Sequence, residues 1–150
     1  MSRANGQRNN SDTEENITQK AMTMKKTALI TGATSGIGEA CARKFAAGGY
    51  NLIITGRRAD RLEEIKTALE AMGAEVVTLA FDVRDAEAAT KAIASLGEGW
   101  QEIDVLINNA GLALGLDKEY EGDPKDWNTM IDTNIKGLLT MTRLVGPGMV

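Results

Sequence analysis

The chain has 150 residues, of which 43% are hydrophobic and 25% charged, and its formal net charge is −4. These proportions are ordinary for a soluble globular domain, and the absence of a basic block argues against a nucleic-acid partner. The apolar runs are too short to cross a membrane, so we expect no membrane partner. With no histidine and a single cysteine, Cys41, the sequence argues against a metal site and an internal disulfide and favours a cytoplasmic location.

The first 23 residues are polar, rich in asparagine and without hydrophobic periodicity. Such a segment cannot bury enough apolar surface to fold, so we predict a disordered extension over residues 1–23. The folded part is then expected to cover residues 24–150.

Four short apolar segments alternate with stretches of helical periodicity. Because these segments lack a polar alternation, helices are expected to cover both faces of the sheet. The pattern predicts an α/β fold with a doubly wound, Rossmann-like parallel sheet. The sequence stops after the fourth strand and the following helix, which would leave an interior strand as a bare edge, so we interpret it as the N-terminal part of a single dinucleotide-binding domain. The predicted strands are residues 27–31, 51–55, 76–81 and 103–107.

The helices are predicted from capping residues and apolar spacing. Asp60 and Glu63 have the spacing of a capping box, while Asp85 and Asp123 each precede a further helical segment. We expect the first two helices to bury one apolar face each, with Cys41 as a small packed side chain. These faces comprise Ile37, Ala40, Cys41 and Phe45 in the first helix, and Leu62, Ile65, Leu69 and Met72 in the second.

A glycine-rich turn joins the first strand to the first helix. Its first glycine permits a tight turn, the second leaves room for a pyrophosphate beside the backbone amides, and the third lets the helix pack closely. The helix N-terminus adds free N–H groups and the positive end of the helix dipole. This context predicts a dinucleotide-phosphate site formed by Gly32, Ala33, Thr34, Ser35, Gly36, Ile37 and Gly38.

The end of the second strand indicates which nicotinamide cofactor fits. An NAD-specific site usually has an acidic residue there that binds the ribose hydroxyls. This sequence instead has Gly56 followed by Arg57 and Arg58. A guanidinium group binds phosphate oxygens well and would favour a 2′-phosphate, so we predict NADP as the cofactor.

Four motifs in order resemble the short-chain dehydrogenase/reductase family, from about residue 25 to the last residue. They are the glycine turn with Thr31 before it, Asp82-Val83, Asn108-Asn109-Ala110-Gly111 and Asn134-Ile135-Lys136-Gly137. The resemblance implies that Arg57 binds the 2′-phosphate and that Arg58 stacks on the adenine. It also implies that Asp82 and Val83 hold the adenine ring, and that Asn109, Ala110 and Gly111 hold the sheet and contact the ribose.

The chemistry of that family depends on a Tyr followed four residues later by a Lys, with a Ser that orients the substrate. Neither Tyr50 nor Tyr120 has that Lys, so we expect the Ser, Tyr and Lys beyond residue 150. The resemblance makes Asn134 the one catalytic residue present, acting through a water on its backbone carbonyl. Without the resemblance, Asn134 would be interpreted as a structural helix residue.

Residues 111–115 and 130–134 resemble the subgroup of NADP-dependent 3-hydroxy acid dehydrogenases, which oxidise serine or L-allo-threonine. The implied function is hydride transfer between the nicotinamide and a secondary alcohol or carbonyl. Two alternatives stay open: a 3-oxoacyl carrier-protein reductase, which shares these motifs, and a non-catalytic NADP(H)-binding module.

The last helix is apolar on more than one side, and one of these sides must pack on the sheet. In the family, the same helix of a second subunit covers the other side, so we predict a homotetramer. The alternative is that later parts of the same chain cover it. The residues concerned are Ile131, Ile135, Leu138, Leu139, Met141, Leu144 and Val145.

Overall fold

The computed structural model describes residues 25–150 and contains one parallel sheet with the strand order β3-β2-β1-β4. The predicted disordered extension, residues 1–23, lies outside the described residues. The register places Thr27 opposite Asn51 and Ile30 opposite both Ile54 and Ile107. The strands are β1 (Thr27–Ile30), β2 (Asn51–Gly56), β3 (Val76–Ala80) and β4 (Val105–Ile107).

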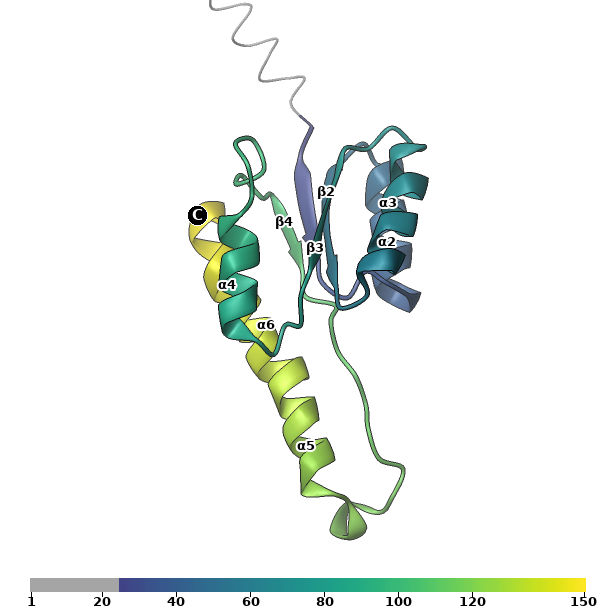
Figure 1. The fold of residues 1–150 in the computed structure, drawn as a ribbon, viewed down its shortest axis with the longest axis vertical. Coiled ribbons are helices and arrows are strands. Elements are labelled where there is room, and N and C mark those ends of the chain that lie inside the picture. Colours follow the sequence, from purple (N-terminus) through teal and green to yellow (C-terminus); the bar gives the residue numbers. More distant parts are fainter. Residues whose placement is uncertain (1–24) are drawn as a thin grey trace, which may run out of the picture.

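Helices cover both faces of this sheet, as expected for a doubly wound fold. In Figure 1, α2 and α3 lie against one face, while α4 and α6 lie against the other. The α-helices are α2 (Gly36–Ala47), α3 (Ala59–Glu70), α4 (Ala86–Ala94), α5 (Pro124–Ile131) and α6 (Leu138–Val145). A π-helical segment, η2 (Asp132–Gly137), joins α5 to α6, and short 3₁₀ turns occur at η1 (Glu119–Glu121) and η3 (Gly146–Met149).

The core consists of two layers, one on each side of the sheet. Successive strand side chains point to opposite faces, so Leu52 and Ile54 pack with α2 and α3, whereas Ile53 packs with α4 and α6. All three side chains are fully buried. Complete burial of such a side chain contributes about 1.5–3 kcal/mol, which explains why β1 and β2 carry no polar alternation.

The start of α3 differs from the prediction. The helix begins at Ala59 with Arg58 at the N-cap position, and Asp60 lies inside the first turn. The predicted capping box is therefore wrong, because the backbone N–H of Leu62 already donates to the carbonyl oxygen of Arg58 at 3.0 Å, so the helical hydrogen bonds begin two residues before Asp60. The carboxylate of Glu63 instead accepts a hydrogen bond of 2.6 Å from the hydroxyl of Thr78 on β3.

The caps predicted for the other two helices are confirmed. The carboxylate of Asp85 accepts from the backbone N–H of Ala88 at 2.9 Å, and that of Asp123 accepts from Lys125 at 2.8 Å. Each bond satisfies one of the backbone donors left free at a helix start.

The apolar face of α2 also differs from the prediction. Ile37 is 77% exposed, and the helix buries the small residues Gly38, Ala42 and Ala46 because it lies close to the sheet. Cys41 is half-buried beside Phe45 at the edge of this layer. Met72, expected in the stripe of α3, lies beyond the end of that helix and is exposed.

We call the nearly continuous helix formed by α5, η2 and α6 (residues 124–145) the α5–α6 arm. Its lower part extends away from the sheet in Figure 1, whereas Met141 and Val145 of α6 are buried in the layer with α4. The opposite side is open, with Ile135 53% and Leu139 59% exposed. The arm is thus apolar on two sides, as predicted. Within residues 25–150, no helix is long and apolar enough to cross a membrane.

Candidate functional site

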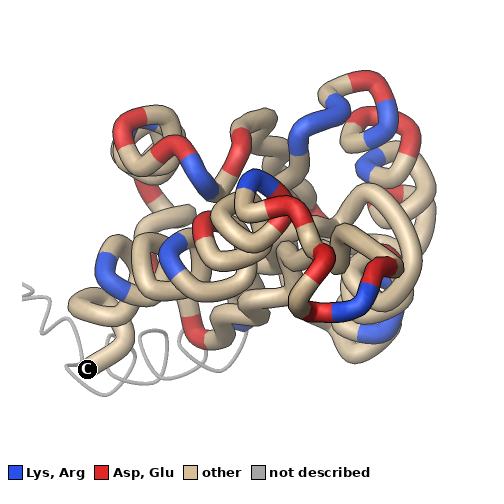
Figure 2. The backbone as a smooth tube through the Cα atoms, turned by 90° about the horizontal axis from the view of Figure 1, so that it is seen from below, with Lys and Arg blue, Asp and Glu red and all other residues tan. Residues whose placement is uncertain are grey.

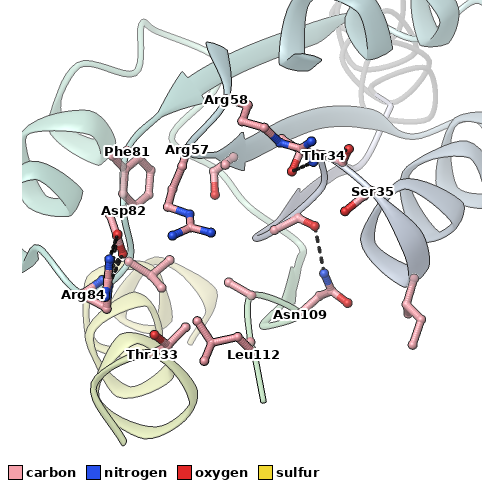
Figure 3. A pocket seen from close by; sticks show the side chains of 17 residues that line it. Thr34, Ser35, Arg57, Arg58, Phe81, Asp82, Arg84, Asn109, Leu112 and Thr133 are labelled. Atoms are coloured by element: carbon pink, nitrogen blue, oxygen red, sulfur yellow. Dashed lines mark hydrogen bonds and ion pairs between the residues drawn. The ribbon is translucent and has the colours of Figure 1, made fainter. Parts of the chain in front are cut away.

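A cavity of about 430 Å³ lies at the carboxyl ends of the strands, where ligands bind in open α/β sheets (Figure 3). The glycine turn, the β2–α3 loop, the β3–α4 turn, the segment after β4 and one residue of η2 form its wall. Predicted site residues in this wall are Gly32, Thr34, Ser35, Ile37, Arg57, Arg58, Asp82, Val83, Asn109, Ala110 and Gly111. The predicted residues Ala33, Gly36, Gly38 and Asn134 are not part of the wall.

The glycine turn needs its glycines for different reasons. Gly32 and Gly36 have φ values of +66° and +56°, in the left-handed region that other residues rarely adopt. A Cβ on Gly32 would also lie 2.8 Å from the Cα of Ala110. A Cβ on Gly38 would overlap the carbonyl oxygen of Gly32 and the side-chain amide of Asn109. The third glycine thus permits the close approach of α2, as predicted.

Asn109 ties the segment after β4 to the glycine turn. Its Nδ2 donates to the carbonyl oxygens of Thr31 and Gly32, both at 3.0 Å. The hydroxyl of Thr31 in turn accepts from the backbone N–H groups of Asn109 and Ala110 at 3.1 and 3.0 Å. These four bonds join the segment that follows β4 to the segment that follows β1.

The N-terminus of α2 faces the same region. Its N-cap residue, Ser35, makes no capping hydrogen bond with its side chain. The first amides of the helix therefore remain free to bind an anion, and the helix dipole favours negative charge there.

The two consecutive arginines of the β2–α3 loop have different surroundings. Nη2 of Arg58 donates to the carbonyl oxygen of Thr34 at 3.2 Å and to its hydroxyl at 3.1 Å. Arg61 on α3 also reaches that carbonyl oxygen, at 3.3 Å. The guanidinium of Arg57 extends into the cavity (Figure 3) and takes part in no hydrogen bond or ion pair within the described part of the chain. Of the two residues, Arg57 is the one whose charge is available to a bound anion.

Asp82 follows β3 and is paired with Arg84, which was not predicted from the sequence as a site residue. Nη2 of Arg84 lies 2.6 Å from Oδ2 of Asp82, and its Nε lies 3.0 and 3.1 Å from the two carboxylate oxygens. The backbone N–H of Arg84 also donates to Oδ1 at 3.0 Å. The hydrogen bonds from Arg84, aided by the charge of Arg57, hold the pKa of Asp82 below its usual value although partial burial opposes this. The spacing of an arginine two residues after an aspartate in a tight turn could have indicated this ion pair from the sequence.

Asn134 lies in the π-helical segment behind the cavity wall. Its Oδ1 accepts from the backbone N–H of Leu112 at 2.9 Å, and its Nδ2 donates to the carbonyl oxygen of Leu112 at 2.8 Å. The side chain thus ties the arm to the loop after β4. The segment itself packs tightly on the β3–α4 turn, since a Cβ on Gly137 would lie 2.8 Å from Cγ2 of Val83. Isolated π-turns often occur at functional sites, and the catalytic role of Asn134 stays a prediction.

Further wall residues were not singled out from the sequence as ligands. Except for one residue of η2, they lie at the end of a strand or in the segment that follows it, so the rule that ligands bind at the carboxyl ends of parallel strands was the signal for most of them. They are Thr55, Gly56, Phe81, Arg84, Leu112 and Thr133.

The charges elsewhere are mixed. Lys and Arg residues lie among Asp and Glu residues along the tube of Figure 2. Within residues 25–150, no group of three or more Cys, His, Asp or Glu residues is arranged to hold a metal ion.

Comparisons with known proteins agree with this geometry. A model of the short chain dehydrogenase family matches residues 26–150. A probable NADP-dependent dehydrogenase of Haemophilus influenzae is 56% identical over 124 residues, which make up 83% of this chain and 48% of that protein. A serine 3-dehydrogenase of Rhizobium radiobacter is 49% identical over 127 residues, which make up 85% of this chain and 50% of that protein. The chain thus spans about half the length of these curated relatives.

Among solved structures, the closed form of a serine dehydrogenase complexed with NADP⁺ is similar, with a TM-score of 0.76 and 48% identity. The match covers 83% of this chain and 49% of that one.

Proposed function

The chain belongs to the short-chain dehydrogenase family, and on this premise we propose that the full-length protein is an NADP(H)-dependent oxidoreductase. It transfers a hydride between the nicotinamide and a secondary alcohol or carbonyl. NADP(H) supplies the hydride chemistry, while the described residues bind and orient the cofactor.

The observation that carries this proposal is the position of Arg57. Its guanidinium lies in the cavity without a hydrogen-bond or ion-pair partner among residues 25–150, beside Gly56, which stands where an acidic residue is usual. The amides at the start of α2 offer the pyrophosphate site, and Arg57 offers the site for the 2′-phosphate. Arg58 and Thr34, already joined by hydrogen bonds, border the same space. Asp82 and Val83 then hold the adenine, while Asn109, Ala110 and Gly111 border the ribose.

The test is the cofactor preference of the full-length protein. A charge-assisted hydrogen bond contributes about 1.5–3 kcal/mol, so Arg57→Ala should lower kcat/KM for NADP⁺ about tenfold to a hundredfold and leave that for NAD⁺ nearly unchanged. Lys91→Ala, which removes an equally charged but exposed side chain on α4, is the control. A preference that Arg57→Ala leaves intact would show that Arg57 is not the phosphate ligand.

The substitution Gly56→Asp is a less direct test than the sequence suggests. An acidic side chain there should repel the 2′-phosphate and shift the preference toward NAD. However, a Cβ at this position would lie 2.5 Å from Cγ2 of Thr34, so the substitution would also displace the side chain of Thr34 in the cavity wall. A loss of affinity for both cofactors is therefore expected in addition to the shift in preference.

For the substrate, we propose a 3-hydroxy acid such as serine or L-allo-threonine, since relatives at about half identity carry names of this kind. The alternatives are a 3-oxoacyl carrier-protein reductase and a non-catalytic NADP(H)-binding module. Initial rates of the full-length protein with NADP⁺ and L-serine, and with NADPH and a 3-oxoacyl thioester, separate the three. Turnover of the thioester alone would favour the reductase, and turnover of neither would favour the module.

Asn134 is proposed as the catalytic residue of this half of the protein, with the Ser, Tyr and Lys supplied by the remainder of the full-length chain. Both the oxygen and the nitrogen of its side-chain amide are bonded to Leu112, so we propose that it acts through its backbone carbonyl. Residues 1–150 alone are accordingly expected to show no turnover with NADP⁺ and serine.

We also propose that the full-length protein is a cytoplasmic homotetramer that uses the open side of the α5–α6 arm. Leu139→Glu should reduce the mass measured by light scattering at micromolar concentration, because it places a charge in the proposed interface. Met141 is unsuitable for this purpose, since it is fully buried within the chain and a charge there would unfold the domain. A monomeric wild type would contradict the assembly.

A further inference from the structure

The cavity contains one carboxylate among several guanidinium groups. Arg57, Arg58 and Arg84 carry positive charges in its wall, and Asp82 carries the negative one. Figure 3 shows Arg58 directed at Thr34, Arg84 directed at Asp82, and the guanidinium of Arg57 between these two pairs. The carboxylate therefore borders the space in which the 2′-phosphate is proposed to bind.

An unpaired carboxylate at this place would oppose that binding in two ways. A phosphate monoester carries a charge of about −1.5 to −2 at pH 7, so a nearby carboxylate repels it. The same carboxylate would also attract the guanidinium of Arg57, whose charge already acts on Asp82. Binding of a 2′-phosphate in this cavity therefore requires a positive group that neutralises the carboxylate of Asp82.

In the β3–α4 turn, Arg84 is this positive group. Nε of Arg84 donates to both carboxylate oxygens of Asp82, Nη2 donates to Oδ2, and the backbone N–H adds a third donor, to Oδ1. The turn is closed by a hydrogen bond of 3.0 Å from the N–H of Asp85 to the carbonyl oxygen of Asp82, and Asp85 caps α4. The side chains of Arg84 and Asp82 are 37% and 27% exposed, so the pair is only partly screened by water.

We propose that Arg84 is a specificity-determining positioning residue, which pairs with Asp82 and thereby keeps Arg57 available for the 2′-phosphate. This inference rests on the proposed function, because it assumes a 2′-phosphorylated nucleotide in the cavity. Arg84 acts through Asp82 and need not touch the phosphate. Its role is to reduce the electrostatic repulsion between the carboxylate of Asp82 and the dianionic 2′-phosphate.

The experiment compares two nucleotides that differ only in the 2′-phosphate. Isothermal titration of the full-length protein with 2′,5′-ADP and with 5′-AMP gives the ratio of their dissociation constants. Any general weakening of adenine binding cancels in this ratio. Arg84→Met should lower the preference for 2′,5′-ADP about tenfold, and Arg84→Lys, which keeps the charge, should lower it less.

The double variant Arg84→Met/Asp82→Asn is the decisive measurement, because it removes the carboxylate together with its partner. The preference should return to within about threefold of the wild type, which is less than 1 kcal/mol. A preference unchanged in Arg84→Met, or one that the double variant does not restore, would overturn the proposal, and the second result would mean direct phosphate binding by Arg84. Thermal unfolding of each variant verifies that it is folded.

The wild-type titration separates this proposal from the function on which it rests. A wild type with no preference for 2′,5′-ADP would overturn both. A wild-type preference that depends on Arg57 but not on Arg84 would overturn only the role of Arg84.

Discussion

The glycine turn and the α5–α6 arm differ in how many contacts their residues make with the rest of the chain. At the turn, Asn109 binds two carbonyl oxygens, and Gly38 has no room for a Cβ. On the open side of the arm, Ile135 and Leu139 are more than half exposed. Residue identity at the turn is thus dictated by atoms of the same chain, whereas on the open side of the arm the described residues supply no comparable contacts.

The largest effect is expected from adding one carbon to the turn. Gly38→Ala introduces a Cβ that overlaps the carbonyl oxygen of Gly32, so the helix and the turn must separate. Overpacking of this kind costs about 1–3 kcal/mol, and thermal unfolding together with nucleotide titration should show lower stability and lost binding. Gly97→Ala is the matched control, because a Cβ there has no neighbour within 4 Å. Equal effects of the two substitutions would contradict the comparison.

An intermediate effect is expected where the arm meets the loop after β4. Asn134→Ala removes the two hydrogen bonds to the backbone of Leu112. Because the side chain of Asn134 is exposed to water, the total cost should be about 1 kcal/mol, at the low end of the range for two bonds. The amide of Leu112 should then exchange its hydrogen faster, as measured by hydrogen exchange of the full-length protein. Asn128→Ala, an exposed asparagine on the same arm, should leave that exchange unchanged. Unchanged exchange in Asn134→Ala would mean that the loop is held by other contacts.

The smallest effect is expected in how the free energy of unfolding depends on pH. The pKa of Asp82 is held below its usual value, first by the hydrogen bonds from Arg84, so the pair stabilises the folded state at pH values above the ordinary pKa of an aspartate. This contribution is lost as the pH falls through the lowered pKa. For a partly exposed pair, it is less than about 1 kcal/mol.

Urea unfolding of wild type and Arg84→Met from pH 7 to pH 2.5 measures this contribution. The difference in unfolding free energy should shrink below the usual range of aspartate titration. A difference that stays constant over the whole pH range would contradict the assignment.

The sequence by itself determined the alternation of strands and helices and the position of the glycine turn. Apolar strands without polar alternation require cover on both faces, and the sheet has it. Most predicted cofactor residues line one cavity because all of them follow strand ends, and parallel strands bring those ends together. The caps at Asp85 and Asp123 were predictable for a similar reason, since a cap depends only on residues within one turn of the helix.

Only the tertiary structure decided which groups pair across these segments. The helix α3 begins at Ala59, before the Asp60 that the local pattern offered as its cap. The exposure of Ile37 depended on how closely α2 approaches the sheet. The sequence could not show that Arg58 binds Thr34 while Arg57 has no such partner in the part of the chain that the structure describes, although the two are adjacent and chemically identical. Hydrogen bonds and ion pairs between residues far apart in the sequence depend on distances that are set only when the chain folds. A local sequence pattern, by contrast, predicts only the helix or strand to which its residues belong.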